Sequence, residues 1–339
     1  MQKTIILEQP GQLRFAHTEE PGAPEPGEAL VRVRQIGVCG TDLHAFQGDQ
    51  PFFSYPRILG HELGVEVLEV GKNERGLTAG TKCSVEPYFH CGRCPACLRG
   101  KPNCCLSLQV LGVHIDGGMR EYIHVPFQYL HPSPTLSLDQ LALIEPLGIG
   151  AHAVSRAQLH EGERVAVVGA GPIGLAVTQF AVLAGAEVIV MDVSEQRLQF
   201  CQEHWPQTTC LSGQGDFLPA LRDRFGDDLP TAVFDATGNP RSMHTSFSYV
   251  GQGGRIIFVG LFQGDITFND PDFHRRELTI LSSRNATSAD FRRIIADMEA
   301  GRIHITPWIT HRATAEEVVD SFPRWLDRNS GIVKAVITM

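Results

Sequence analysis

The segment Arg164-Val-Ala-Val-Val-Gly169-Ala-Gly171-Pro172-Ile173-Gly174-Leu decides the fold. Its apolar start predicts a buried strand over 164–168, and the G-x-G-x-x-G spacing that follows precedes a helix expected over 173–184. Gly169 permits a tight turn, Gly171 lets the backbone approach a pyrophosphate, and Gly174 allows the helix to pack closely on the strand. The N–H groups at the start of the helix are then available to phosphates. The predicted cofactor-binding residues of this segment are Gly169, Gly171, Pro172, Ile173 and Gly174.

Asp192 closes the next predicted strand, over 187–191. It lies eighteen residues after Gly174, close to the roughly twenty residues expected before an acid that binds the adenosine ribose. Such a carboxylate accepts hydrogen bonds from the ribose hydroxyls and repels a 2′-phosphate, so the sequence predicts NAD rather than NADP. A solvated aspartate in a turn is the alternative interpretation. Arg197 can reach the adenosine side of the cofactor, although a surface ion pair explains its position equally well.

The stretch from Val165 to Ala186 contains no charged residue and is long enough to span a membrane. Its glycines and its proline fall where a strand turns into a helix, however, and a spanning helix does not need them. The N-terminal apolar run is too short for the core of a signal peptide. Nine cysteines in a chain without an export signal favour a reducing compartment, in which clustered thiols more often hold metal than form disulfides. We therefore expect a cytoplasmic protein without a membrane partner.

The chain changes its pattern near residue 139. Before it, short β-rich runs between Gly and Pro predict a mostly antiparallel barrel or sandwich, with strands at 5–7, 29–36, 63–70, 82–86 and 121–125. A helical pattern then covers Asp139–Arg156, which Pro146 and Gly148 are expected to interrupt. After it, strands and helices alternate, which predicts βαβ units and a doubly wound parallel sheet. The remaining elements of this second half are expected as strands at 232–234, 255–259, 278–282 and 331–338 and as helices at 195–203, 241–250 and 289–300.

The net charge of the chain limits the classes of molecule that it is expected to bind. At 339 residues the chain is long enough for about two domains. Its formal net charge is -9, and Lys and Arg are scattered without a basic run. A phosphate backbone would be repelled overall, so we expect a small-molecule substrate and no nucleic acid.

Five of the nine cysteines lie between Cys91 and Cys105. The spacing C-x2-C-x2-C-x7-C of Cys91, Cys94, Cys97 and Cys105 lets four thiolates converge on one zinc ion. Four thiolates close the coordination shell, so this zinc is expected to be structural. Spacing alone does not separate Cys104 from Cys105 as the fourth ligand. A nucleic-acid zinc ribbon is the alternative, which the acidic chain disfavours.

A second set of metal-ligand residues lies nearer the N-terminus, in Cys39-Gly-Thr41-Asp42-Leu-His44 and in Gly60-His61-Glu62. One thiolate, one imidazole and one carboxylate make a three-ligand zinc site that leaves a position for water or an alcohol. Each residue also has an ordinary interpretation, since Cys39 can be a packed core thiol and His61 a turn histidine.

Together these motifs resemble the zinc-containing medium-chain dehydrogenases over nearly the whole chain. The spacing of that family selects Cys105 over Cys104. The resemblance implies an α/β plus β fold: a GroES-like catalytic domain over 1–148, to which 286–339 return, and an inserted Rossmann domain over 149–285 that binds NAD. It also implies two zinc ions per chain, one catalytic and one structural, and a homodimer or homotetramer.

Within the family, Ile144-Glu145-Pro146-Leu147-Gly148 resembles the polyol and threonine dehydrogenase branch. The resemblance implies that Cys39, His61 and either Glu62 or Glu145 hold the catalytic zinc. An oxygen-rich site of this kind suits a substrate with adjacent hydroxyls. In the implied mechanism the Thr41 hydroxyl accepts the proton of the alcohol and passes it, through the nicotinamide ribose, to His44. Asp42 either orients His61 or caps a turn.

Three further segments resemble bacterial sugar-acid dehydrogenases: Phe52-Phe-Ser-Tyr-Pro-Arg57, Gly112-Val-His114-Ile-Asp116-Gly-Gly118 and Ser283-Arg284-Asn285-Ala-Thr287. This likeness implies oxidation of an aldonate to a keto acid. Arg57 or Arg284 is expected to bind the carboxylate of the substrate unless either is structural, and His114 either contacts the substrate or supports the zinc lobe. Met119 and Arg120 depart from the usual family pattern, which has an aromatic residue at Met119. The alternatives are a polyol or L-threonine dehydrogenase and a non-catalytic nucleotide sensor.

Overall fold

The computed structural model describes residues 1–50, 53–213, 215–327 and 330–339. The chain forms two compact units, and each is described by itself. The first unit comprises Met1–Pro146 and Ala286–Met339, and the second comprises Leu147–Asn285. The boundary between Pro146 and Leu147 lies inside helix α4 (Ile144–Ala157).

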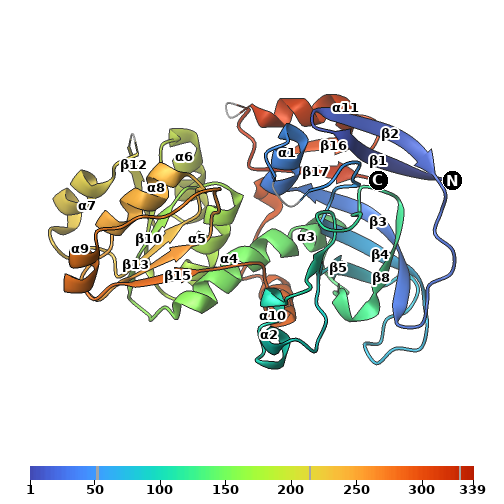
Figure 1. The fold of residues 1–339 in the computed structure, drawn as a ribbon, viewed down its shortest axis with the longest axis horizontal. Coiled ribbons are helices and arrows are strands. Elements are labelled where there is room, and N and C mark those ends of the chain that lie inside the picture. The colour runs from blue at the N-terminus through green and yellow to red at the C-terminus, as the bar shows by residue number, and fades with distance from the viewer. Residues whose placement is uncertain (51–52, 214, 328–329) are drawn as a thin grey trace. The chain divides into compact units, whose positions relative to one another are not determined.

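The first unit is built mainly of strands (Figure 1). Its main sheet has the order β16-β17-β3-β4-β5-β9, and β8 pairs with β3 outside this path. All of its pairs are antiparallel except the parallel pair of β16 and β17. Two small sheets pair β1 with β2 and β6 with β7. The strands of this unit are β1 (Gln2–Gln9), β2 (Gln12–Thr18), β3 (Glu28–Val38), β4 (Glu62–Val70), β5 (Lys82–Val85), β6 (Tyr88–Phe89), β7 (Gln109–Val110), β8 (Tyr122–Pro126), β9 (Leu130–Pro132), β16 (Ile309–Thr314) and β17 (Lys334–Thr338).

Short helices connect these strands. The α-helices of the first unit, besides the start of α4, are α1 (Gly40–Gln47), α2 (Pro95–Leu98), α3 (Leu138–Ala142), α10 (Ser288–Glu299) and α11 (Val318–Ser321). Its 3-10 helices are η1 (Pro102–Cys104), η2 (Phe127–Tyr129), η4 (Thr306–Trp308) and η5 (Phe322–Leu326).

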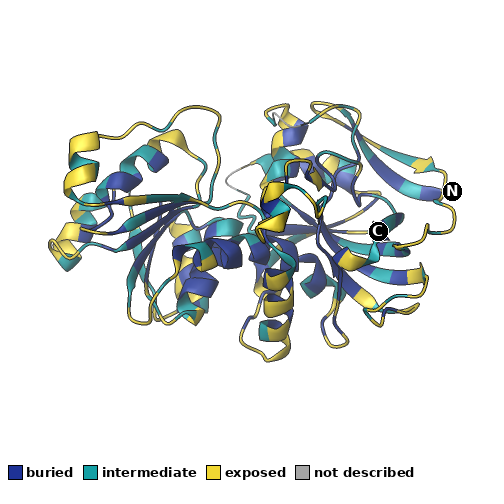
Figure 2. Ribbon diagram, turned by 60° about the horizontal axis from the view of Figure 1, so that its bottom comes forward, coloured by how far each residue is buried: buried dark blue, intermediate teal, exposed yellow. Residues whose placement is uncertain are grey.

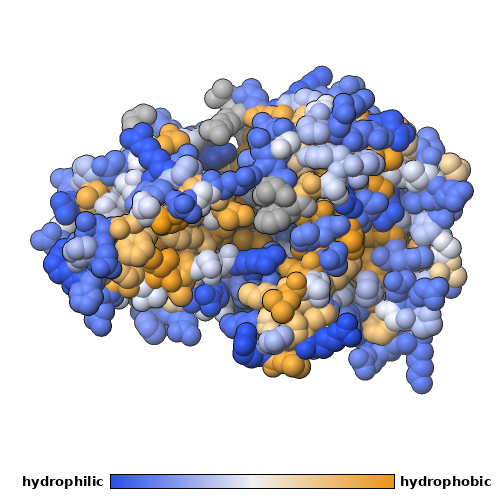
Figure 3. Space-filling model, in the orientation of Figure 1, coloured by the Kyte–Doolittle hydropathy of each residue, from blue (hydrophilic) through white to orange (hydrophobic). Residues whose placement is uncertain are grey.

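On the face shown in Figure 3, apolar side chains gather around α2, whose last residue, Leu98, is 75% exposed.

The second unit has a six-stranded parallel sheet with the order β12-β11-β10-β13-β14-β15. Counted from β10, this is the order 3-2-1-4-5-6 of a Rossmann sheet, which binds dinucleotides where the order reverses between its first and fourth strands. Helix α5 (Pro172–Leu183) packs against β10, β11 and β13. The strands are β10 (Arg164–Val168), β11 (Glu187–Asp192), β12 (Thr209–Ser212), β13 (Ala232–Asp235), β14 (Arg255–Phe258) and β15 (Thr279–Ser282). The other helices are α6 (Glu195–His204), α7 (Leu218–Phe225), α8 (Pro240–Thr245), η3 (Ser246–Ser248) and α9 (Asp270–Arg275).

Burial follows the two types of sheet (Figure 2). In β3 the residues Ala29, Val31 and Val33 are fully buried and alternate with partly exposed ones, because successive side chains of a strand face opposite sides of the sheet. In β10 all four residues from Val165 to Val168 are buried, because helices cover both faces of a parallel sheet. Each unit therefore has its own apolar core.

The structure corrects one predicted feature. The helical pattern over Asp139–Arg156 is interrupted at Leu143, which ends α3, and not at Pro146 or Gly148. Pro146 lies in the first turn of α4, where its missing N–H has no helical partner to lose. The sequence analysis missed several described elements, namely the strands β2, β6, β7, β9, β12 and β16, the helices α1, α2, α7, α9 and α11, and the 3-10 helices η1, η2, η4 and η5.

The uncharged stretch from Val165 to Ala186 forms most of β10, the glycine turn and α5. Among the described residues, no helix is long and apolar enough to cross a membrane.

Candidate functional site

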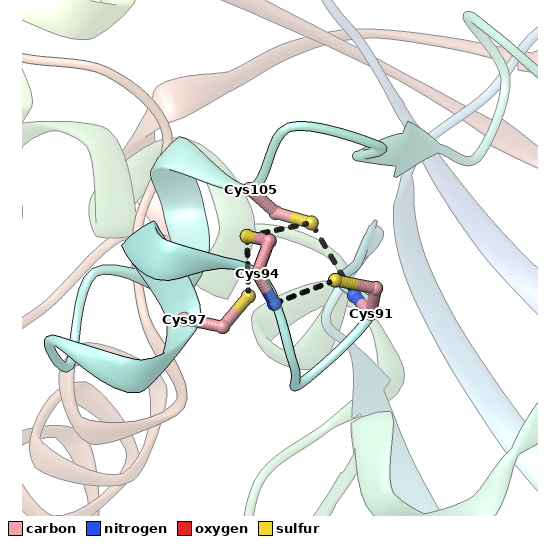
Figure 4. Close-up of side chains that lie close together, drawn as sticks. All are labelled: Cys91, Cys94, Cys97 and Cys105. Atoms are coloured by element: carbon pink, nitrogen blue, oxygen red, sulfur yellow. Dashed lines mark hydrogen bonds between the residues drawn. The ribbon is translucent and has the colours of Figure 1, made fainter.

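The four cysteines predicted to bind a structural metal lie together in the segment 91–105 of the first unit, here called the lobe (Figure 4). The Sγ atoms of Cys91, Cys94, Cys97 and Cys105 all lie within 4.8 Å of one another, and that of Cys94 is 3.5 Å from Cys97 and 3.9 Å from Cys105. Cys104 is exposed and stands outside this group. Four sulfurs at these separations fit the closed shell of a structural zinc.

Short local structure produces the cluster. Cys94 precedes the first turn of α2, in which Pro95 occupies the first helical position, and Gly92 has a φ of 70° that allows the chain to turn between the first two cysteines. The N–H of Cys94 donates to the Sγ of Cys91 at 3.3 Å. Hydrogen bonds from the backbone of Arg93 and Cys94 lower the pKa of Cys91 to about 6, which favours the thiolate that binds metal.

The second set of ligand residues is assembled from neighbouring strands. The register of β3 and β4 pairs Gly37 with Glu62, so Cys39, just beyond the end of β3, lies beside His61 and Glu62 at the start of β4. One ligand atom of each of these three residues lies within 4.8 Å of the others. His61 is 5% exposed and Glu62 is fully buried. The thiolate, imidazole and carboxylate fit the donor set of a catalytic zinc site.

The charges around His61 favour a cation at this place. Burial lowers the pKa of His61, but the negative charges of Asp42 and Cys39 outweigh it and raise that pKa well above its usual value. The same negative charges would attract a divalent metal ion, so the electrostatics of the site agree with its donor chemistry.

Asp42 caps a turn, which is one of the two roles that the sequence left open, and it also faces His61. Its Oδ2 accepts a hydrogen bond from the N–H of Cys39 at 2.9 Å and so caps α1. Its Oδ1 lies 3.7 Å from the Nδ1 of His61, which is an electrostatic contact too long for a hydrogen bond. Asp42 is fully buried, and burial raises the pKa of its carboxyl group.

Lys334 on β17 is a member of the site that the sequence analysis missed. Its Nζ donates to both carboxylate oxygens of Glu62, at 2.7 and 2.9 Å, and to the carbonyl of Val38 at 3.1 Å. Burial lowers the pKa of Lys334, but the charges of Glu62 and Cys39 raise it above its usual value, so the lysine stays charged. A side chain at Gly37 would overlap the Glu62 carboxylate, which explains the glycine at this position.

Glu145 is held by a different partner. It lies in the first turn of α4, is 4% exposed, and accepts a hydrogen bond at Oε1 from the hydroxyl of the buried Tyr88. Burial raises the pKa of Glu145 to about 7. Among the described residues the group of three close ligands contains Glu62 and not Glu145, although Glu145 lies near enough to affect the pKa of His61.

Thr41 and His44 lie three residues apart on α1 and therefore on the same side of this helix. Thr41 is partly buried and His44 is exposed. This gradient of exposure is what a route for a proton to solvent requires.

The residues proposed to touch the substrate have structural partners. Arg57 Nη1 lies 3.2 Å from Asp116 Oδ1, and its Nη2 donates to Ser54 at 2.7 Å. His114 accepts a hydrogen bond at Nδ1 from the N–H of Val110, within its own turn. Arg284 is exposed. Phe52, which begins the motif that ends at Arg57, lies outside the described residues.

Met119, the departure from the aromatic pattern, is fully buried. A Cβ at Gly60 would lie 3.1 Å from the Cγ of Met119, and Gly60 has a φ of 93°. Met119 therefore packs against the glycine that directly precedes His61 and leaves no room there for a larger residue.

The second unit positions the predicted cofactor residues at the carboxyl ends of its strands. Gly169 follows β10 with a φ of 94°, which favours glycine, and a Cβ on Gly174 would overlap the carbonyl of Gly169. Gly171 precedes the first turn of α5, in which Pro172 and Ile173 lie. The tight turn and the close packing that the G-x-G-x-x-G spacing predicts are thus both present.

Asp192 is the last residue of β11 and is 6% exposed. Its Oδ2 accepts from the N–H of Ala170 in the glycine turn at 2.6 Å, and its Oδ1 accepts from the N–H of Ser194 at 2.8 Å. Arg197 Nη1 is 4.0 Å from Asp192 Oδ2. The carboxylate is therefore held beside the glycine turn and is not a solvated turn residue.

Asp235, at the end of β13, was missed by the sequence analysis. It is fully buried and accepts hydrogen bonds from Thr237, Ser242 and Ser246 at 2.6 to 3.0 Å. This network fixes the loop after β13, next to the glycine turn at the point where the strand order reverses. The sequence feature that could have revealed Asp235 is an aspartate at the end of an apolar strand, followed closely by Thr237-Gly238.

Comparison with known proteins gives the family. Residues 25–135 match the alcohol dehydrogenase GroES-like domain, and residues 172–300 match the zinc-binding dehydrogenase domain. L-galactonate-5-dehydrogenase of Escherichia coli K12 is 42% identical over 334 residues, which cover 98% of each chain.

Two solved structures share the whole fold. One is described as a short chain alcohol dehydrogenase, rspB, of E. coli CFT073 in complex with NADH; it has a TM-score of 0.92 at 31% identity and covers 100% of this chain and 99% of its own. The other is a zinc-binding dehydrogenase of Sinorhizobium meliloti 1021 bound to NADP, with a TM-score of 0.91 at 29% identity and the same coverage. The chain therefore belongs to the zinc-binding, GroES-like medium-chain dehydrogenases, a family of nicotinamide-dependent oxidoreductases that act on CH–OH donors.

Proposed function

We propose that the protein oxidises a secondary alcohol of a sugar acid, an aldonate similar to L-galactonate, to the corresponding keto acid, with NAD as the acceptor. The observation that carries this proposal is the group of Cys39, His61 and Glu62, whose ligand atoms lie within 4.8 Å of one another. A non-catalytic sensor has no need of a three-ligand metal site.

The chain's own residues prepare the site for this reaction. When bound, zinc supplies a Lewis acid for the substrate hydroxyl, and NAD supplies the acceptor for the hydride. Lys334 offsets the charge of Glu62 and fixes both of its oxygens. Tyr88 fixes Glu145, whose pKa of about 7 lets it change protonation near neutral pH. Glu62 is the more direct candidate for the metal, and Glu145 is a second acid of the same buried region.

The proton of the alcohol leaves along α1 in this proposal. The Thr41 hydroxyl is partly buried and can accept a hydrogen bond while donating another. His44 is exposed and faces solvent. A bound nicotinamide cofactor would supply the ribose hydroxyl between these two side chains.

Asp192 supports NAD as the cofactor. Its carboxylate is buried at the end of β11 and bound to the N–H of Ala170, so a 2′-phosphate placed near it would meet a fixed negative charge. Arg197 stands 4.0 Å from that carboxylate and is engaged with it electrostatically. We therefore propose a preference for NAD over NADP.

The proposal of a sugar acid rests on similarity. The relative named L-galactonate-5-dehydrogenase is 42% identical over nearly the whole chain. A carboxylate substrate needs a cation, and the candidates are Arg57, which pairs with Asp116, and the exposed Arg284. By family likeness we also propose a homodimer or homotetramer, and the exposed and half-exposed thiols favour the reducing cytoplasm.

A screen of NAD reduction over aldonates, polyols and amino-alcohols tests the proposal. We expect turnover with an aldonate, and none in the Cys39→Ser variant. Turnover with sorbitol or L-threonine alone would replace the sugar acid by a polyol or an amino-alcohol. No turnover with any of the three classes, in protein with about two zinc ions per chain, would overturn the enzyme proposal in favour of a nucleotide sensor.

A further inference from the structure

A hollow of about 350 Å³ lies in the first unit, lined by Arg75, His131, Pro132, Arg292 and Ile295. None of these residues belongs to the metal-ligand groups or to the glycine turn. Its volume is at the lower end of the roughly 300–1,000 Å³ usual for small-molecule sites. The hollow therefore needs an explanation of its own.

The two arginines give the hollow a positive charge. Arg75 lies in the loop between β4 and β5, where its Nη1 donates to the carbonyl of Gln128 at 2.8 Å, and Arg292 lies exposed on α10. Neither guanidinium forms an ion pair with any acid of the described part of the chain. A pair of unneutralised guanidinium groups on one concave surface is an arrangement that binds carboxylate or phosphate.

His131 supplies a buried polar atom. The residue is 1% exposed, and its Nε2 lies 2.8 Å from Oε2 of Glu86, which also accepts from Ser288 at 2.6 Å. Within the described residues the Nδ1 of His131 has no hydrogen-bond partner. A buried polar atom without a partner is costly unless a ligand or water satisfies it.

The protonation state of His131 determines whether its Nδ1 donates or accepts a hydrogen bond. Burial lowers the pKa of His131, Glu86 raises it, and the charges of Arg75 and Arg292 lower it further, with a net lowering. The lowered pKa favours the neutral ring. Because a carboxylate only accepts hydrogen bonds, Nε2 carries the proton, and Nδ1 is left as an acceptor that requires an O–H or N–H donor.

We propose that this hollow is a second binding site, for a small oxyanion that carries a hydroxyl group. The guanidinium groups of Arg75 and Arg292 bind the charged oxygens, and the Nδ1 of His131 accepts a hydrogen bond from the hydroxyl. Hydroxy-carboxylates and hydrogen phosphate share this chemistry. The apolar side chains of Pro132 and Ile295 contact the carbon skeleton of an organic ligand.

Calorimetric titration of the zinc-loaded protein with glycolate, at constant ionic strength and pH 7.5, tests the site. Arg75→Gln and Arg292→Gln should each weaken binding about five- to tenfold, the amount expected for loss of one partly exposed charged hydrogen bond. The control is Arg293→Gln, which removes the same charge from the neighbouring position of α10 and should leave the affinity unchanged. Cys39→Ser should also leave it unchanged, because the metal site is not involved.

Two further probes identify the ligand chemistry. Acetate has the charge of glycolate without the hydroxyl and should bind at least about threefold more weakly, whereas hydrogen phosphate that binds more tightly than glycolate would assign the site to phosphate. No heat of binding for glycolate or phosphate up to roughly 50 mM would overturn the proposal. Equal weakening by Arg293→Gln and Arg292→Gln would also overturn it, because it would indicate diffuse charge attraction. Neither result depends on whether the protein oxidises an aldonate.

Discussion

The first unit contains two groups of metal-ligand residues that are built in opposite ways. The four cysteines of the lobe come from a span of fifteen residues, carry one kind of ligand and are mostly half-exposed. The second group takes Cys39 from just beyond the end of β3, His61 from just before β4 and Glu62 from the first position of β4, and its lysine comes from β17, 272 residues from Glu62 along the chain. The first group is local, because one short segment supplies all of its ligands. The second group is tertiary, because the fold brings its residues together from separate strands.

The difference shows how each group is stabilised. Backbone N–H groups of the same short segment stabilise the thiolate of Cys91, so this site depends on its own segment. In the other group buried side chains neutralise one another: Lys334 pairs with Glu62, Tyr88 donates to Glu145, and Asp42 faces His61. Damage to the local group should therefore stay local, whereas damage to the tertiary group should affect both the reaction and the fold.

The largest effect is expected for Cys39→Ser. Loss of the thiolate removes one of three ligands, so we expect kcat/KM to fall by more than about a thousandfold, with roughly one zinc ion retained per chain. Steady-state kinetics and metal analysis of the same sample measure both. Activity near that of the native protein would remove Cys39 from the reacting centre.

Lys334→Met tests the buried ion pair. The substitution leaves the fully buried Glu62 without its cation, and we expect the free energy of unfolding to fall by about 3–5 kcal/mol. Urea unfolding measures this change, and the double variant Lys334→Met/Glu62→Gln should recover a large part of it. An equal loss in the single and the double variant would show that the charge of Glu62 is not the cause.

Glu145→Gln tests the acid held by Tyr88. In the folded chain the pKa of Glu145 is about 7, above its usual value of 4.5, so between these pH values the folded state binds more protons than the unfolded state. The stability of the metal-free protein should therefore decrease as pH rises from 4.5 to 7, by at most about 3 kcal/mol from this group. The variant lacks the titrating group, so its melting temperature should change less with pH, and parallel curves for the two proteins would contradict the assignment.

Cys97→Ser should have a smaller effect on the fold as a whole. We expect the loss of about one zinc ion per chain and a decrease in melting temperature of about 2–5 °C, because the lobe opens locally. Calorimetry and metal analysis measure the two quantities, and kcat should remain within about threefold of the native value. A loss of activity as large as that of Cys39→Ser would show that the two metal groups are coupled.

Cys104→Ala gives the smallest expected effect and completes the comparison. Cys104 is exposed and outside the group of four sulfurs, so zinc content should not change and the free energy of unfolding should change by less than about 0.5 kcal/mol. If the Cys104→Ala variant lost zinc while the Cys105→Ala variant kept it, the fourth ligand would be Cys104 and not Cys105.

Much of the fold was predictable because the decisive patterns are local. The glycine spacing after β10, the apolar strands of the parallel sheet and the cysteine spacing each express geometry that a few consecutive residues set. The elements that escaped prediction lack such a pattern. Strand β12, for example, has four residues of intermediate or exposed character at the edge of its sheet, so neither alternation nor a continuous apolar run marks it.

The sequence by itself determined the family of the chain, the doubly wound order of its second half, and the identity of the residues that can bind metal or dinucleotide. Tertiary structure alone decided which acid has which partner. Lys334 reaches Glu62 because β17 lies beside β3, and Tyr88 reaches Glu145 because the short strand β6 returns to the start of α4. The physical reason is burial: the charge state and orientation of a buried acid depend on the groups that surround it in space, and no spacing along the chain records those groups.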